Sequence, residues 1–310
     1  MRNEEQVLSH EQIEQFKELG WVKVEQAFSR ELALACQQFL WSKLEERGIA
    51  QTDRSTWMTP MIYIQEAYRS PEFDQCNTLR MASAIEDLIG KDRWTDKGIY
   101  GIDEIRSTWG WWPVNFALGA EKDWTVPTEG WHWDGIHFRH YVDSPDQGLL
   151  CLCLFSDIAP RGGGTLVLEG SHKLVARFLA EHPEGLESQA AIDALNIRHP
   201  YLSELTGQQP GSGEASAADR VQRFMDTWHT DADGIRLRVV ETTGSPGDVI
   251  LCHPFLYHTA SQNHNRVPRF MCNRTTPLKE RMNLNRGDER GYSPLELSVR
   301  QALKGIVHDG

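Results

Sequence analysis

Two residues in the middle of the chain have the types and the spacing that can hold a metal ion. In the run EGWHWDG, His132 and Asp134 lie two residues apart, so their side chains leave the same face of an extended strand. One imidazole and one carboxylate supply two ligands of a facial triad, which leaves neighbouring positions of an iron(II) ion open. The third ligand of such a triad is usually a histidine from a distant strand.

The run GDVILCHPFLYHTAS contains two histidines that could complete this set, His253 and His258. Their separation of five residues places them on opposite faces of a regular strand, so one metal ion is not expected to bind both. Pro254 could break the strand and relax this restriction. The spacing alone does not choose between the two histidines.

An arginine further along the chain could hold a carboxylate near the metal. Arg266, Arg269 and Arg274 follow the two histidines, and a guanidinium binds a carboxylate through two parallel hydrogen bonds. A histidine, a His-x-Asp pair and an arginine within a β core together describe an iron(II) enzyme that uses 2-oxoglutarate as its co-substrate.

The elements that must position these residues are mainly β-strands. From about residue 99 the chain consists of short apolar segments that Gly, Pro and Asp turns separate, a pattern typical of a jelly-roll barrel. Strands are expected within residues 107–118, 122–134, 147–158, 164–170, 235–243, 247–253, 256–261 and 269–277. Helices are expected at residues 10–19, 30–47 and 80–90. The pattern predicts a mainly β protein with flanking helices and a double-stranded β-helix (jelly-roll, cupin-like) core.

The chain is expected to form one domain of residues 1–310. Its expected parts are an N-terminal helical part (1–98), a jelly-roll core (99–172 and 234–278), a helical insertion (173–233) and a C-terminal segment (279–310). The insertion contains helix-forming stretches around a run of small residues. We interpret it as a possible lid over the substrate entrance.

Composition excludes several classes of function. The 310 residues include 44 acidic and 32 basic side chains, with a formal net charge of −12, so a surface for nucleic-acid phosphates is not expected. No stretch approaches the roughly 18–20 apolar residues of a membrane span, and the first residues lack the apolar run of a secretory signal. The six cysteines include no Cys-x-x-Cys pair. We expect a cytoplasmic monomer or homodimer that acts on a small molecule, with no nucleic-acid or membrane partner.

Four segments, taken in order, resemble the phytanoyl-CoA dioxygenase family of iron(II)- and 2-oxoglutarate-dependent oxygenases. They are LSHEQIEQFKELGWVKV, WHWDG, GGGTLVLEGSHK and GDVILCHPFLYHTASQNHNRVPRF. In the last segment the family places a ligand histidine at the end of an H-x-x-x-x-H run and a co-substrate arginine eleven residues later, and eleven residues after His258 is Arg269. The resemblance therefore favours His258 over His253 and Arg269 over Arg266.

The resemblance implies an active site in which His132, Asp134 and His258 bind iron(II). The C5 carboxylate of 2-oxoglutarate would pair with Arg269, and the hydroxyl of Thr165 would bond the same co-substrate. With O2, such an enzyme oxidises a small-molecule metabolite or natural product and releases succinate and CO2. The resemblance also implies that the carboxylate of Asp134 favours hydroxylation, desaturation or a similar oxidation over halogenation, because related halogenases have a small residue at this position.

Two alternatives to hydroxylation stay open. The same class of enzyme catalyses desaturation, ring rearrangement or epimerisation. A metal-binding jelly-roll protein without redox turnover would also carry the three ligands.

Three residues are candidates for contact with the substrate. His137 and Arg139 follow the His-x-Asp pair and could reach a polar or anionic group. Trp111 could wall an apolar pocket.

Six of the eleven tryptophans gather just before and within the His-x-Asp segment. Strand alternation predicts that Trp109 and Trp111 share one face while Trp112 lies on the other. It also directs Trp131 and Trp133 away from the metal. Packing in the core is the expected role of most of them.

Overall fold

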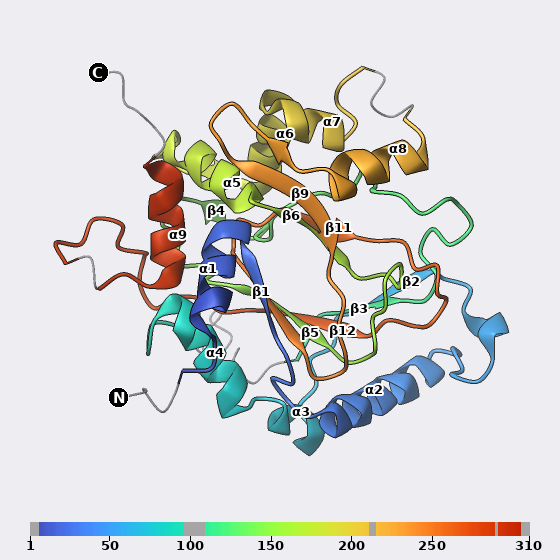
Figure 1. The fold of residues 1–310 in the computed structure, drawn as a ribbon. Helices are drawn as coiled ribbons and strands as arrows, with labels where there is room; N and C mark the ends of the chain where they lie inside the picture. The colour runs from blue at the N-terminus through green and yellow to red at the C-terminus, as the bar shows by residue number, and fades with distance from the viewer. Residues whose placement is uncertain (1–5, 96–108, 211–214, 289–290, 305–310) are drawn as a thin grey trace.

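Two β-sheets face each other and form the core of the molecule (Figure 1). The computed structural model describes residues 6–95, 109–210, 215–288 and 291–304. In the first sheet the strands lie in the order β1 (Trp21–Val24), β10 (Val249–Cys252), β5 (Leu150–Leu154) and β12 (Met271–Thr275). In the second sheet the order is β11 (His258–Ala260), β6 (Thr165–Glu169), β9 (Arg236–Glu241) and β8 (His229–Thr230). The pairings are antiparallel, as in a jelly roll.

Two further strand pairs complete the β structure. β2 (Met61–Ile64) pairs with β3 (Trp112–Asn115), and a bridge between Asn115 and Arg269 joins β3 to the chain that leads into β12. The first sheet is thereby extended beyond β12 by two strands. β4 (Arg139–His140) and β7 (Leu186–Glu187) form a separate short pair.

Alternate side chains of the strands fill the space between the two sheets. One buried cluster joins Leu150, Leu152 and Leu154 of β5 to Ile250 of β10 and Val167 of β6. The intervening residues of β5 and β10 belong to the larger core outside this space; they are Cys151, Cys153, Val249 and Leu251. Because both faces of the first sheet are covered, β5 is apolar along its whole length.

Helices cover the outer faces of the sheets (Figure 1). The N-terminal ones are α1 (His10–Leu19), α2 (Arg30–Glu45), α3 (Pro71–Gln75) and α4 (Leu79–Ile89), with a 3₁₀ turn, η1 (Arg54–Thr56), after α2. The insertion supplies α5 (Ser171–Ala180), α6 (Ser188–Arg198), α7 (Pro200–Leu205), α8 (Ala217–Val221) and the π-helical turn η4 (Gln222–Asp226). α9 (Pro294–Leu303) packs against α1, α4 and α5.

Capping residues explain where the first helix begins and ends. The Ser9 hydroxyl accepts the amide of Gln12, whose side chain accepts the amide of Ser9 in return, and Gly20 ends α1 with φ at 88°. The predicted mainly β class with flanking helices is confirmed. So are the three predicted N-terminal helices, although the second ends at Glu45.

Three parts of the chain differ from the predicted elements. Residues 122–134 form no regular strand, because Pro127 and Gly130 interrupt it, and His132 contributes a single bridge. The N-terminal part, expected to be helical, also contributes β1 and β2 to the sheets. α9 lies in a segment for which no element was predicted.

The tryptophans around Gly110 do not follow strand alternation. Trp109 and Trp112 stack with ring centroids 6.4 Å apart and are both fully buried, whereas Trp111 is 39% exposed. The prediction that Trp109 and Trp111 share a face is therefore wrong. The physical reason is that the regular strand begins only at Trp112, so alternation does not extend back through Gly110.

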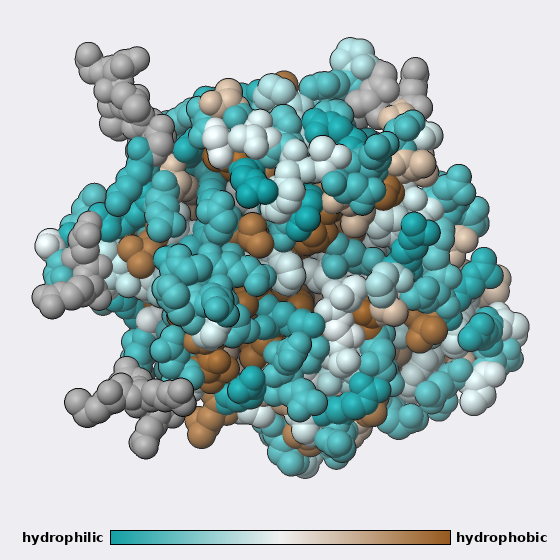
Figure 2. Space-filling model, in the orientation of Figure 1, coloured by the Kyte–Doolittle hydropathy of each residue, from teal (hydrophilic) through white to brown (hydrophobic). Residues whose placement is uncertain are grey.

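Hydrophilic residues predominate on the face shown in Figure 2, and apolar ones are scattered among them. No helix in the described part of the chain has the length and apolar character needed to cross a bilayer.

Two histidines lie buried beside α1, at the start of α5 and in the turn after β10. Nε2 of His172 donates to the carbonyl of Lys17 (3.1 Å), and the ring of His172 lies 4.8 Å from that of His253. Burial lowers the pKa of His172 to about 3, and the charge of Lys173 acts in the same direction. Burial also holds the pKa of His253 well below its usual range. Both rings are therefore neutral at pH 7.

We expect the protein to lose stability steadily as the pH falls from about 6.5 towards 3. The unfolded chain takes up a proton at His172 near pH 6.5, whereas the folded chain does so only near pH 3, so acid favours the unfolded state in this window. The loss amounts to about 1.4 kcal/mol per pH unit for this residue. Urea titrations in EDTA at several pH values would measure it as the free energy of unfolding.

The substitution His172→Gln removes the titrating group and should flatten this pH dependence, although it will cost some stability at neutral pH. His182→Gln, at a partly exposed histidine just after α5, is the matched control and should keep the wild-type slope. Equal slopes for the wild-type and His172→Gln proteins would contradict the prediction.

Candidate metal centre

The His-x-Asp segment and β11 lie side by side and exchange two backbone hydrogen bonds. The amide of His132 donates to the carbonyl of His258 (3.1 Å), and the amide of His258 donates to the carbonyl of His132 (2.8 Å). Directly opposed residues of an antiparallel pair have their side chains on the same face, and the two imidazole centroids are 4.3 Å apart. Gly135 then turns the chain away with φ at 120°, a conformation that only glycine adopts without strain.

Backbone carbonyls orient both imidazole rings. Nδ1 of His132 lies 2.7 Å from the carbonyl oxygen of Gly130, and Nδ1 of His258 lies 3.0 Å from that of Leu256. Because a carbonyl can only accept, the network assigns the proton to each Nδ1 and leaves a lone pair on each Nε2. Metal-binding histidines are held in the same way.

The two Nε2 atoms and a carboxylate oxygen of Asp134 converge. Oδ1 of Asp134 lies 3.3 Å from Nε2 of His132 and 3.5 Å from Nε2 of His258. Ligand atoms bound at right angles around one ion, each about 2.1 Å from it, would be about 3 Å apart. Among the described residues, these three form the one group whose possible ligand atoms all lie within 4.8 Å of one another. Two imidazole nitrogens and one carboxylate oxygen are a donor set that fits iron(II).

The same arrangement keeps the carboxylate ionised. Burial by itself would raise the pKa of Asp134. At the low pH where a carboxyl titrates, the imidazoles also carry a proton on Nε2, and the charge of His258 and the hydrogen bonds that both rings then donate outweigh burial and hold this pKa well below its usual range. Burial would also lower the pKa of His132, but the hydrogen bond and charge of Asp134 outweigh it and raise this pKa. Asp134 therefore presents an anionic oxygen at neutral pH.

Arg269 is a buried cation with few partners. It is 1% exposed. Its Nη2 donates to the carbonyl of Pro113 (3.0 Å), its Nη1 lies 3.7 Å from the sulfur of Met271, and its Nε has no partner among the described residues. Burial lowers the pKa of Arg269 to about 10, although the nearby Tyr63 and Glu241 act to raise it, so the group stays charged at pH 7. A buried charge is costly unless an opposite charge joins it, and a carboxylate fits this guanidinium.

Thr165 and Arg269 reach the same place from the two sheets. The hydroxyl of Thr165 lies 3.8 Å from the sulfur of Met271, which Arg269 also contacts. On β6, Val167 lies opposite His258, so Thr165 is two residues, or about 7 Å, further along the same face. The hydroxyl and the guanidinium are therefore placed to bind one end of a short molecule whose other end reaches the metal ligands.

Two buried asparagines hold the chain that leads to Arg269. Nδ2 of Asn263 donates to the carbonyls of Asn115 (2.9 Å) and Val267 (2.8 Å), and Nδ2 of Asn115 donates to the carbonyl of Ser261 (3.0 Å). These bonds attach β3 to the loop between β11 and Arg269. They therefore set the position of the guanidinium relative to the histidines.

The other two arginines considered from sequence lie elsewhere. Arg274 is on the opposite face of β12, where its guanidinium stacks 4.2 Å from the ring of Trp109 and donates to Asn77. Arg266 is exposed.

Arg139, a predicted substrate contact, is bound within the protein itself. Its guanidinium donates to the carbonyls of Glu184 and Gly185 and to the carboxylate of Glu187, each at 2.8 Å. These bonds fasten β4 to the turn before β7 and leave few donors for a ligand.

The other two predicted substrate contacts are at the surface. His137 is exposed, three residues after Asp134. Trp111 is 39% exposed and stacks on the exposed ring of Tyr63, with centroids 5.5 Å apart.

Sequence reasoning did not identify Met271, Asn273 or Tyr63 near this site. The first two lie two and four residues after Arg269, so the two-residue period of a strand could have placed them on its face. Tyr63 carries no such signal, because β2 reaches the site only through its pairing with β3.

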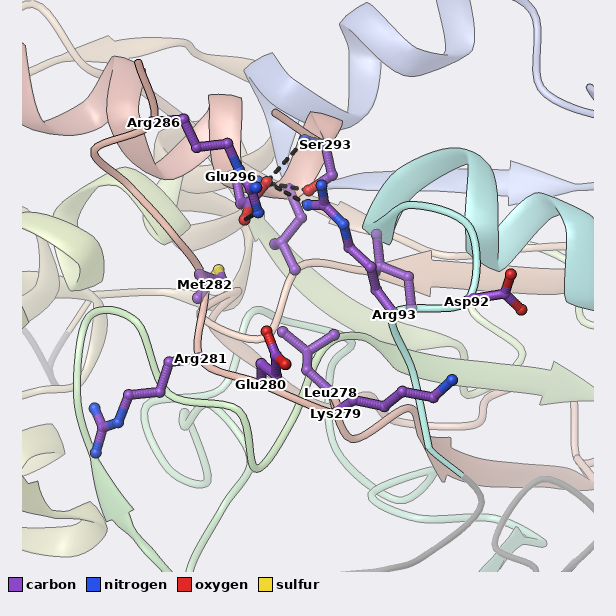
Figure 3. Close-up of a pocket in the computed structure, with 12 residues that line it drawn as sticks. Asp92, Arg93, Leu278, Lys279, Glu280, Arg281, Met282, Arg286, Ser293 and Glu296 are labelled. Carbon is purple, nitrogen blue, oxygen red and sulfur yellow. Dashed lines mark hydrogen bonds and ion pairs between the residues drawn. The ribbon is translucent and has the colours of Figure 1, made fainter. Parts of the chain in front are cut away.

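A separate cavity of about 220 Å³ lies between α4, α9 and the chain that follows β12 (Figure 3). Three of its charged groups bind one another, since Arg93 and Arg286 both pair with the carboxylate of Glu296. Lys279 and Arg281 point in different directions (Figure 3). The cavity contains none of the metal-site residues, and we assign no ligand to it.

The chain resembles known oxygenases. A family model described as phytanoyl-CoA dioxygenase (PhyH) matches residues 7–271. No curated protein matches the chain.

Similar solved structures are distant in sequence. EctD from S. alaskensis with 2-oxoglutarate and 5-hydroxyectoine is 17% identical with a TM-score of 0.47, covering 89% of this chain and 78% of EctD. The non-heme alpha-ketoglutarate-dependent carbocyclase SnoK from nogalamycin biosynthesis is 13% identical with a TM-score of 0.47, covering 92% and 89%. HygX from Streptomyces hygroscopicus with nickel and 2-oxoglutarate is 14% identical with a TM-score of 0.48, covering 88% of each chain. Likeness at this level does not identify the reaction or the substrate.

The match to the family model is stronger evidence than these structural similarities, because it spans most of the chain. It includes the His-x-Asp segment, β11 and Arg269. The chain therefore belongs to the phytanoyl-CoA dioxygenase family of iron(II)- and 2-oxoglutarate-dependent oxygenases.

Proposed function

We propose that this oxygenase hydroxylates a small organic molecule at a metal site formed by His132, Asp134 and His258. The observation that supports this most is the convergence of two Nε2 atoms and one carboxylate oxygen, with both Nδ1 protons held by backbone carbonyls. Iron(II), together with 2-oxoglutarate and O2, supplies the oxidising chemistry when bound, with succinate and CO2 as co-products.

The protein contributes binding and orientation to this reaction. His132, Asp134 and His258 would hold the iron(II), which would supply the oxidising chemistry together with the co-substrate and O2. Arg269 binds the C5 carboxylate of 2-oxoglutarate, and Thr165 donates its hydroxyl to the same group. The carbonyls of Gly130 and Leu256 keep the two imidazoles in the tautomer that can bind metal.

The buried charge of Arg269 favours an enzyme over a metal-binding protein without turnover. A protein that only held a metal ion would have no use for a buried guanidinium whose Nε lacks a partner among the described residues. Desaturation, ring rearrangement and epimerisation use the same groups, and analysis of the product distinguishes them from hydroxylation.

Adding iron(II) and 2-oxoglutarate to the protein without oxygen should produce a weak visible charge-transfer band. With oxygen, ascorbate and substrate, succinate should form. A wild-type protein that binds iron(II) but gives no band with 2-oxoglutarate would contradict the proposal.

Asp134→Ala should weaken iron(II) binding more than about 100-fold, because it removes the anionic ligand and leaves two neutral imidazoles. The loss can be measured by titrating the charge-transfer band or by equilibrium dialysis of the metal. His182→Ala, which removes a partly exposed histidine far along the chain, is the control and should bind iron(II) as the wild type does. Retention of tight binding by Asp134→Ala would remove Asp134 from the ligand set.

Arg269→Leu should raise the 2-oxoglutarate concentration needed for half saturation by about 10- to 100-fold, the size expected from losing a charge-assisted hydrogen bond. Iron(II) binding should change little. The charge-transfer band, titrated with 2-oxoglutarate, reports both quantities.

Arg274→Leu is the matched control for this substitution, because Arg274 lies on β12, five residues after Arg269, with its side chain on the opposite face of the sheet. It should reduce stability without changing the 2-oxoglutarate requirement. A similar shift in both variants would show that Arg269 acts through folding and not through the co-substrate.

We further propose that the chain is one domain in which residues 173–233 form a cover beside the active site. The support is Arg220 of α8, which is 5% exposed and donates to the carbonyls of Val126 (2.8 Å), Pro127 (3.2 Å) and Leu205 (2.7 Å). These bonds attach the insertion to the segment that leads into His132.

Arg220→Leu should loosen this cover. Loss of the three bonds should raise the rate of amide hydrogen exchange in α7 and α8 about tenfold or more, because the buried carbonyls lose their donors. Arg223→Leu, which breaks a partly exposed ion pair with Glu204, should have a smaller effect. An unchanged rate of amide hydrogen exchange in Arg220→Leu would contradict the proposal that Arg220 attaches the insertion to the segment before His132.

A further inference from the structure

The bridge between Asn115 and Arg269 defines a register that continues along β3 and β12. Asn115 and Arg269 exchange backbone hydrogen bonds in both directions, and the amide of Asn273 donates to the carbonyl of Trp111 (3.0 Å). Counting from the first pair places Pro113 opposite Met271 and Trp111 opposite Asn273. Opposed residues of an antiparallel pair share a face, so Trp111, Asn273 and Arg269 lie on one face of the extended sheet.

This face is the one that looks into the space between the two sheets. Asn273 lies opposite Leu152 of β5, and Leu152 belongs to the buried cluster that also contains Val167 of β6. Val167 in turn lies opposite His258. Asn273 therefore faces the same space between the sheets as Val167, the residue paired with a proposed metal ligand.

Tyr63 extends the same face by one more strand. It lies opposite Pro113 in the pairing of β2 with β3. Its ring stacks on that of Trp111 with centroids 5.5 Å apart and planes inclined by 35°. We call Tyr63 and Trp111 the aromatic wall.

Exposure increases from Arg269 towards the aromatic wall. Arg269 and Met271 are buried and Asn273 is partly buried, while Trp111 and Tyr63 are 39% and 51% exposed. A packing role would have buried these rings, as it buries Trp109 and Trp112. The solvent-exposed part of this face therefore begins beside the buried Arg269 and ends at β2, which is the edge strand.

The side-chain amide of Asn273 has an oxygen without a hydrogen-bond partner among the described residues. This oxygen, Oδ1, is buried. An amide left in this state costs free energy until another polar group joins it. Because an amide oxygen accepts, a hydroxyl or N–H group of a ligand, which can donate, would satisfy it.

The chemistry of this face selects a class of ligand. Of the residues of β2, β3 and β12 that share it, none is charged, and Arg269 just before β12 is engaged by the co-substrate in the proposed function. An anionic group would find no second cation here. The flat faces of two aromatic rings favour a ring system, which can offset-stack on them.

We propose that the aromatic wall and Asn273 bind the substrate, and that this substrate is an uncharged cyclic molecule with a hydroxyl or N–H group that donates to the Asn273 oxygen. The ring system packs on Trp111 and Tyr63, and its polar group hydrogen-bonds the amide of Asn273. This inference rests on the proposed function, because it takes Arg269 as occupied by 2-oxoglutarate.

Three probes of similar size test the inference: 2-naphthol, naphthalene and 2-naphthoate. Their affinities are measured by equilibrium dialysis against the full chain loaded anaerobically with iron(II) and 2-oxoglutarate. The wild type should bind 2-naphthol and naphthalene more tightly than the anionic 2-naphthoate. Trp111→Ala and Tyr63→Ala should weaken both neutral probes about tenfold.

Asn273→Ala separates the hydrogen bond from general packing. It should weaken 2-naphthol several-fold and leave naphthalene unchanged, because only 2-naphthol carries the hydroxyl. Trp57→Ala is the aromatic control, since Trp57 packs on Phe116 and Trp41 at the outer face of the sheet, and it should not alter the binding of any probe.

Several results would overturn the inference. Equal probe affinities in the wild type and the Trp111, Tyr63 and Asn273 variants would do so. So would loss of the charge-transfer band in Asn273→Ala, which would assign Asn273 to the co-substrate. If the aromatic wall instead formed an interface between two copies of the chain, Trp111→Ala would change the sedimentation coefficient without changing probe binding, and this result would also overturn the inference. If the wild type gave no band while the probe differences persisted, the proposed function would fail and the binding site would stand.

Discussion

The candidate active site depends on one pair of backbone hydrogen bonds, between His132 and His258. Neither residue belongs to a long ladder, since β11 has three residues and the His-x-Asp segment contributes a single bridge. The pairing puts both imidazoles on one face, and each ring is then oriented by the carbonyl two residues before it, from Gly130 or Leu256. A slip of one residue would turn one imidazole to the opposite face and separate the ligands. Every other part of the proposed chemistry requires this register.

The space between the sheets combines an apolar part with a charged part. The leucines of β5 fill one region, while the partly exposed Asp134 and the fully buried Arg269 bring opposite charges into another. Each charge is costly in isolation. The proposed ligands supply the missing partners, because a metal cation meets the carboxylate and a carboxylate co-substrate meets the guanidinium. Electrostatic complementarity to ligands therefore explains why such residues are retained in an otherwise apolar core.

The tryptophans serve two purposes that their abundance alone does not reveal. Trp109, Trp112 and Trp133 are fully buried and contact other aromatic rings, and so stabilise the layers around the sheets. Trp111 stays partly exposed on the same face of the sheet as Tyr63, whose ring it contacts. Because an exposed stacked pair gains less from burial than a core pair does, its position beside Arg269 is more readily understood as a surface for a ligand.

Local patterns in the sequence determined the mainly β class, the first helices, the His-x-Asp pair and the direction of Trp133, since strand period and helix caps act over a few residues. The same patterns did not decide between His253 and His258 or among the three arginines. The family resemblance then favoured His258 and Arg269. In the tertiary structure His253 packs against His172 beside α1, whereas His258 lies opposite His132. The contribution of β2, and the faces of Trp111 and Asn273, were likewise decided by strand pairing. Alternation is a local property, but which strands pair depends on contacts between segments far apart in the chain, and no short pattern encodes them.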